Sequence, residues 1–163
     1  SIRKNIGVVS QDIIIFEETV RYNLNLGKNF SEADLYEVLD AVGLTETIEN
    51  LPKGIDTEIS AASHNLSGGQ KQRLMIARLL LKKPSFIVLD EATSALDIET
   101  EKNIAEYLAN FAVDATMLVV SHRLETIKNC DKIMVLDEHR IVNMGTHDEL
   151  LISSPIYHEL FGR

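Results

Sequence analysis

Short apolar runs that end abruptly in polar residues recur along the chain. They are Ile6–Val9, Phe86–Leu89 and Met117–Val120. None of them alternates with polar residues, a pattern typical of strands buried on both faces of a parallel sheet. Ligands of such sheets bind outside the carboxyl ends of the strands. The polar side chains that follow the runs are therefore expected to converge on one crevice: Gln11, Asp90, Glu91 and His122.

Helical sequence fills most of the remaining chain. Helices are predicted over Glu32–Val42, Thr45–Asn50, Ser67–Leu81, Ile98–Phe111, His147–Ile152 and Ile156–Phe161. Ser31 and Gly43 have the chemistry of an N-cap and a C-terminal stop for the first of these. Lys132–Leu136 and Arg140–Met144 flank a turn and predict a β-hairpin. Between about residues 14 and 83 no strand is predicted, so the sequence indicates an α/β fold with a helical insertion.

Composition narrows the class of protein. The 163 residues carry 16 Lys and Arg against 25 Asp and Glu, a net charge of −9, and 45% of them are hydrophobic. That balance suits a globular domain and argues against a nucleic-acid-binding surface. A single cysteine, Cys130, excludes an internal disulfide framework. The chain begins at Ser1 without a signal sequence and reaches strand-like sequence almost at once, so we expect a chain cut within a fold.

Leu66-Ser67-Gly68-Gly69-Gln70 is the strongest chemical signal. Ser67 and Gln70 have capping-box spacing. Gly68 and Gly69 lack side chains, so a phosphate could approach the unpaired N–H groups at the positive end of the helix dipole. When the segment is taken alone, a structural helix N-cap that contains flexible glycines explains it about as well.

The residues after the predicted strands can be interpreted either as catalytic or metal-binding groups or as purely structural ones. Asp90 could hold Mg²⁺ through water, and Glu91 could orient or deprotonate a water molecule. In isolation, an acidic pair at a strand end is more often a solvated loop. His122 could bind a transferred phosphate or be a structural histidine. Gln11 could ligate a metal or a water molecule, or cap a loop.

Together these residues resemble the ATP-binding cassette (ABC) family. Gln11 is similar to the family's Q-loop glutamine, and residues 66–70 are identical to its LSGGQ signature. Residues 86–91 resemble the Walker B strand and catalytic glutamate. Residues 94–97 resemble the D-loop, and His122 the switch histidine. Order and spacing also agree, over nearly the whole chain.

The resemblance implies a P-loop NTPase-like parallel sheet core, here incomplete, with an α-helical subdomain insertion. Residues 1–13 and 84–163 would form the RecA-like core, residues 14–83 the helical subdomain, and the whole the carboxyl-terminal part of one ABC ATPase domain. It also implies ATP hydrolysis with Mg²⁺. Glu91 and His122 would be catalytic, and Asp90 with Gln11 would hold the metal.

The resemblance further implies a head-to-tail dimer with a second cassette. Leu66, Ser67, Gly68, Gly69, Gln70 and Asp97 would contact nucleotide held by that partner. Residues 16–24, 54–57 and 145–151 are similar to segments of exporter-type cassettes. In that group the cassette is usually fused behind a transmembrane domain, so we expect a region at the cytoplasmic face of the cell membrane that powers export.

Two departures from the family pattern modify these expectations. The Walker A pattern G-x-x-x-x-G-K-[ST] does not occur, since the one Gly27-Lys28 pair is followed by Asn29. Without it the isolated chain is expected to bind ATP weakly or not at all, and to self-associate through the sheet position left unfilled. In addition, a V-G-E-x-G stretch found in exporters is replaced by Ile59–Ser63, which places Ala61 at the acidic position.

Two alternatives remain open. One is a non-transport ABC ATPase of the DNA-repair or translation-associated type, although heptads and a second cassette are not seen. The other is a non-catalytic interaction fragment, which describes the isolated chain best.

Overall fold

The computed structural model describes residues 5–10, 12–60, 65–92, 98–111 and 115–162. Its strands are β1 (Ile6–Val9), β2 (Glu18–Thr19), β3 (Glu58–Ile59), β4 (Phe86–Asp90), β5 (Thr116–Val120), β6 (Ile133–Asp137) and β7 (Arg140–Gly145). Its helices are α1 (Val20–Asn25), α2 (Glu32–Ala41), α3 (Thr45–Glu49), the 3₁₀ turn η2 (Gly54–Asp56), α4 (Gly68–Lys82), α5 (Ile98–Phe111), α6 (Leu124–Ile127), α7 (His147–Ser153) and α8 (Pro155–Phe161). The chain forms two compact units, Ser1–Val120 and Ser121–Arg163.

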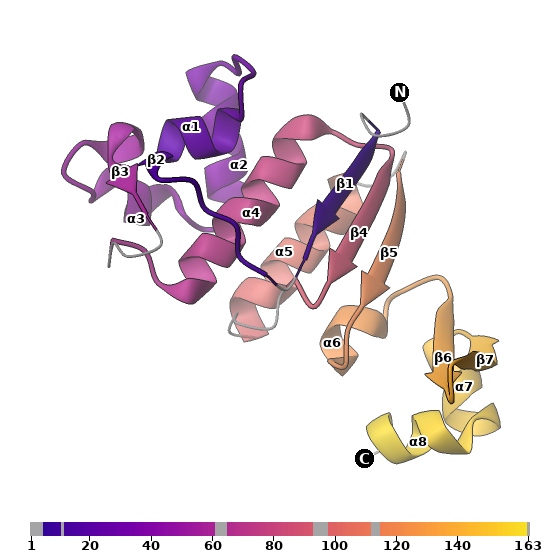
Figure 1. Ribbon diagram of the computed structural model, residues 1–163. Coiled ribbons are helices and arrows are strands. Elements are labelled where there is room, and N and C mark those ends of the chain that lie inside the picture. Colours follow the sequence, from indigo (N-terminus) through magenta and orange to yellow (C-terminus); the bar gives the residue numbers. More distant parts are fainter. Residues whose placement is uncertain (1–4, 11, 61–64, 93–97, 112–114, 163) are drawn as a thin grey trace. The chain divides into compact units, whose positions relative to one another are not determined.

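A parallel sheet in the order β1-β4-β5 organises the first unit (Figure 1). Val8 of β1 lies opposite Val88 of β4, and Val88 lies opposite Leu118 of β5. Helices α4 and α5 lie on one side of this sheet (Figure 1). The three apolar runs are therefore parallel strands, and the predicted α/β fold is confirmed.

The prediction that both faces of these strands are buried was wrong. On the face toward the helices, Val9, Ile87 and Leu89 are buried. The opposite face exposes large apolar side chains in the part of the chain that the structure describes: Ile6, Val8, Phe86, Leu118 and Val120. The reason is that α4 and α5 cover one face only, while a parallel sheet is ordinarily covered on both.

Gly7 permits the close contact between β1 and α4. An added Cβ at this position would lie 2.1 Å from Leu79 Cδ1 and 2.8 Å from Pro84 Cγ, so a side chain has no room there. The glycine thus lets the helix approach the sheet and bury Leu79.

The helices between β1 and β4 pack with the sheet in one continuous core. Capping confirms the predicted helix starts: Ser31 accepts a hydrogen bond from the N–H of Asp34, and Ser67 from that of Gln70. Gly43 follows α2 with a φ of 63°, in agreement with the predicted stop.

The prediction of no strand between residues 14 and 83 was also wrong. β2 and β3 form an antiparallel pair in which Glu18 lies opposite Ile59. Each strand has two residues. Runs this short have no periodicity, and their pairing partner is about 40 residues away. The separate subdomain expected at residues 14–83 stays a prediction.

The second unit is small and has its own core. The hairpin β6–β7 is confirmed, with a register shift between Val135 and Leu136. Its core contains Ile127, Ile133, Val135, Leu150 and Tyr157. His147 Nδ1 lies 2.9 Å from the Tyr157 hydroxyl, and this contact joins α7 to α8.

Candidate functional site

The first turn of α4 forms an exposed, glycine-rich helix start. The N–H of Gln70 donates to Ser67 Oγ at 3.2 Å, and the N–H of Ser67 donates to Gln70 Oε1 at 2.7 Å. This is the predicted capping box. Leu66, 4% exposed, anchors the turn in the core, whereas Ser67 and Gly68 face solvent.

Open space surrounds Gly68. A Cβ added there would have no heavy atom within 4 Å among the described residues. The N–H groups at the first helical positions have no intrahelical acceptor, and the helix dipole places positive potential beside them. An anion is therefore electrostatically favoured at this turn.

Asp90 and Glu91 lie at the carboxyl end of β4, the central strand of the sheet. Asp90 is exposed and Glu91 is half-buried. The N–H of Glu91 donates to Val120 O at 2.9 Å, so it is bonded to the last residue of β5. Both carboxylates thus occupy the sheet edge where ligands of open α/β sheets bind.

The carboxylates at this edge are ligands of the kind that Mg²⁺ takes. Among the described residues no three His, Cys, Asp or Glu side chains cluster to hold a metal. Mg²⁺ commonly takes one or two carboxylates and keeps water and substrate phosphates as its other ligands. Asp90, exposed at the end of β4, fits that role.

The structure brings only some of the predicted site residues together. Asp90 and Glu91 lie in the first unit with α4. Gln72 connects α4 to Glu91, because its Nε2 donates to Glu91 O at 3.4 Å. His122 belongs to the second unit. Gln11 and Asp97 lie outside the described residues, as does Ala61. Convergence of all these residues on one crevice stays a prediction.

A buried arginine connects α4 to the segment after residue 11. Arg78 is 8% exposed, and it donates to Asn23 O at 2.7 Å and to Ile14 O at 3.0 Å. A third bond runs to Asn23 Oδ1 at 3.0 Å. Burial lowers the pKa of Arg78 from its ordinary value. The guanidinium lies 5.7 Å from the centre of the Phe16 ring.

Asn23 completes this network from α1. It is fully buried, and its amide group accepts from the N–H of Phe16 and donates to the carbonyl oxygens of Phe16 and Thr19. The segment from Ile14 to Thr19 is thus bonded to both α1 and α4. Sequence reasoning missed Asn23, Gln72 and Arg78. For Arg78 a signal was available, because it is the one charged residue within the apolar stretch Leu74–Leu81.

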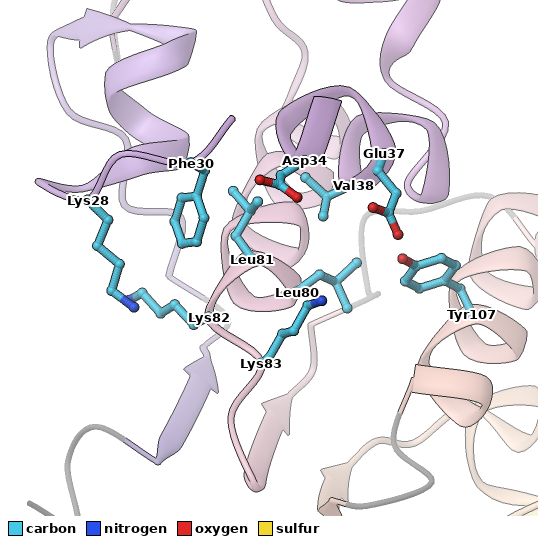
Figure 2. A pocket seen from close by; sticks show the side chains of 10 residues that line it. All are labelled: Lys28, Phe30, Asp34, Glu37, Val38, Leu80, Leu81, Lys82, Lys83 and Tyr107. Carbon is cyan, nitrogen blue, oxygen red and sulfur yellow. The ribbon is translucent and has the colours of Figure 1, made fainter. Parts of the chain in front are cut away.

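A separate pocket of about 370 Å³ lies at the other end of α4 (Figure 2). Lys28, Lys82 and Lys83 line it together with Phe30 and Tyr107. Because α4 has 15 residues, it is about 22 Å long, and this pocket lies at the end away from the LSGGQ turn. Cations at a helix C-terminus are explained by the helix dipole. The pocket is therefore no part of the candidate site.

No helix among the described residues is long and apolar enough to cross a bilayer.

Comparison with known proteins places this geometry in a family. The profile of the ABC transporter family matches residues 1–94. A protein of Staphylococcus aureus strain RF122 named as a multidrug export ATP-binding/permease protein is 46% identical over 162 residues. The corresponding protein of strain NCTC 8325 is 45% identical. Both alignments cover 99% of this chain and 28% of the relative, so the chain spans little more than a quarter of these proteins.

A solved structure supports the same assignment. The structure of a bacterial Atm1-family ABC exporter with ATP bound is 38% identical and superposes with a TM-score of 0.90, over 99% of this chain and 28% of that one. The fold of this chain is thus that of the ATP-binding region of an ABC exporter. The chain belongs to the ABC transporter family, and it corresponds to part of the ATP-binding region of the family's exporter-type members.

Proposed function

We propose that this chain is part of the ATP-hydrolysing motor of an exporter that moves its substrate across a membrane. The motor would contain two ATP-binding regions arranged head to tail, each joined to a transmembrane domain at the cytoplasmic face. The observation that carries the proposal is the first turn of α4, an exposed LSGGQ helix start with open space around Gly68. A turn with that geometry suits a phosphate presented by a partner molecule.

The proposed site residues divide into two groups. Gln11, Asp90, Glu91 and His122 would act on nucleotide held by their own domain. The turn 66–70, with Asp97, would act on nucleotide held by the partner. This division is supported by α4, which ties its second turn to Glu91 through Gln72 while Ser67 and Gly68 stay exposed.

Hydrolysis in this proposal depends on positioning and electrostatics. Glu91 orients the attacking water and accepts its proton. His122 donates a hydrogen bond to the γ-phosphate, and Asp90 with Gln11 would hold Mg²⁺. When bound, the metal neutralises charge that develops on the phosphate oxygens.

The isolated 163-residue chain is proposed to bind Mg-ATP weakly or not at all. No G-x-x-x-x-G-K-[ST] motif occurs in its sequence, and that motif is what holds the β- and γ-phosphates in this class of enzyme. Isothermal titration of Mg-ATP onto the chain tests this. Micromolar binding would contradict it.

Non-transport ABC ATPases remain the second candidate. The names of the relatives above favour export. The sequence upstream of this region distinguishes the two candidates, because a set of hydrophobic spans supports an exporter and a second cassette refutes it.

Glu91→Gln in the parent transporter tests the function most simply. The amide cannot accept the proton of the attacking water, so we expect turnover to fall by about 10²–10⁴-fold while an ATP-bound dimer accumulates. Glu46→Gln is the matched control, because Glu46 lies in the first turn of α3 and should not affect turnover. Near-normal hydrolysis by the Glu91 variant would remove the role assigned to it.

A further inference from the structure

Glu91 has an unusual backbone conformation for its place in the fold. Five described residues other than glycine have a positive φ: Leu26, Lys83, Glu91, Glu138 and His139. Leu26 and Lys83 end helices, and Glu138 and His139 form the β6–β7 turn, where such angles are ordinary. Glu91 has a φ of 48° directly after β4, the central strand of the sheet. For a residue with a Cβ this costs about 1–2 kcal/mol, and it persists only where the surroundings enforce it.

Among the described residues, backbone hydrogen bonds hold Glu91 on each side of its Cα. The N–H of Glu91 donates to Val120 O at 2.9 Å, which ties it to β5. Its carbonyl oxygen accepts from Gln72 Nε2 at 3.4 Å, which ties it to α4. Gln72 is only 2% exposed, and burial restricts the freedom of its amide group.

Gln72 lies close to the LSGGQ turn as well as to Glu91. Gln72 lies in the second turn of α4, three to five residues after Ser67, Gly68 and Gly69, which is within about one and a half helical turns of them. In the proposed function, those residues bind nucleotide held by the partner, whereas Glu91 acts on nucleotide of its own domain. One side chain therefore joins elements that serve two different ATP sites.

We propose that Gln72 is a positioning residue for Glu91, and that it couples the two ATP sites of the dimer. It holds the left-handed backbone of Glu91 so that the carboxylate stays where the attacking water is bound. Nucleotide that engages the LSGGQ turn fixes α4, and through Gln72 it fixes Glu91. This inference rests on the proposed function.

Gln72→Met in the parent transporter tests the proposal, because methionine keeps the length of the side chain and removes the donor. We expect kcat to fall about 10- to 100-fold, with the Michaelis constant for ATP within about twofold of the wild-type value. An ATP-bound dimer should still form and should accumulate, as in the Glu91→Gln variant.

Arg73→Met is the matched control. Arg73 is the next residue of α4, and its guanidinium donates to Val42 O at 3.2 Å and Gly43 O at 2.7 Å. This variant loses contacts of the same kind on the α2 side of the helix, so its kcat per folded molecule should be unchanged.

Two results would overturn the positioning role. One is a normal kcat for Gln72→Met. The other is a loss of activity that matches a loss of folded protein and of the ATP-bound dimer, since a merely structural residue would behave in that way. The Glu91→Gln variant distinguishes failure of the proposed function from failure of the positioning role. If this variant hydrolyses ATP normally, the proposed function is wrong. If it is inactive while the Gln72→Met variant has normal activity, only the positioning role of Gln72 is wrong.

Discussion

At the scale of single residues, α4 carries one local motif, the capping box of Ser67 and Gln70, and two side chains with distant partners, Gln72 and Arg78. The capping box of Ser67 and Gln70 follows from a spacing of three residues. Gln72 and Arg78 could not be predicted in the same way, because their partners, Glu91 and Asn23, lie 19 and 55 residues away. Their roles depend on which loops the fold brings to α4.

Arg78→Met is expected to destabilise the chain by roughly 2–3 kcal/mol. The guanidinium is buried and donates to three oxygen atoms of Ile14 and Asn23, which would lose these donors. The cost of burying the charge offsets part of the loss. Urea unfolding measures the change.

Lys82→Met on the same helix serves as the control for this prediction. Lys82 is exposed, so its replacement should change the free energy of unfolding by less than about 0.5 kcal/mol. Equal stability of the Arg78 variant and the wild-type chain would show that the buried network contributes nothing.

At the scale of elements, the sequence predicted the long helices and the parallel strands well, because caps and apolar runs are strong local signals. It failed for β2 and β3, whose two-residue pairing is set by distant backbone. It also missed α1, although Thr19 caps that helix by accepting from the N–H of Tyr22. Short elements depend on tertiary contacts more than on their own pattern.

The packing of α4 on β1 gives a prediction at this scale. Gly7→Ala should destabilise the fold by about 1–3 kcal/mol, since the new methyl group would overlap Leu79 and Pro84. In a Leu79→Ala background the same substitution should cost less, because the obstructing Cδ1 atom is gone. Gly68→Ala, in open space, is the control and should be nearly neutral. An unchanged unfolding midpoint for Gly7→Ala would contradict the close approach.

At the scale of the whole molecule, one face of the β1-β4-β5 sheet exposes apolar side chains, and β5 ends the strand order among the described residues. The exposed face could not be predicted from the runs themselves, because an apolar run does not say how many helix layers cover it. Unpaired strand edges and apolar faces favour association.

Self-association of the 163-residue chain is therefore expected, and sedimentation velocity over a range of concentrations measures it. Leu118→Lys, at a residue that is 39% exposed on β5, should shift the chain toward monomer. Ile152→Lys in the second unit changes a residue that is 90% exposed and should have no such effect. A wild-type chain that stays monomeric at all concentrations would contradict this expectation.

The central claim is that the LSGGQ turn acts on the partner's nucleotide while Glu91 acts on its own. Gly68→Asp tests the turn without disturbing the fold, because the site is open and a carboxylate is favourable at a helix start. That carboxylate would, however, repel a phosphate.

The most direct measurement is ATP hydrolysis by mixed dimers of the parent transporter. With Gly68→Asp in one subunit and Glu91→Gln in the other, both changes fall on the same site, so we predict the activity of a dimer with one intact site, calibrated by a wild-type and Glu91→Gln pair. With both changes in one subunit beside a wild-type partner, each site is damaged and we predict no hydrolysis. The reverse result, with activity only when both changes share a subunit, would contradict the account.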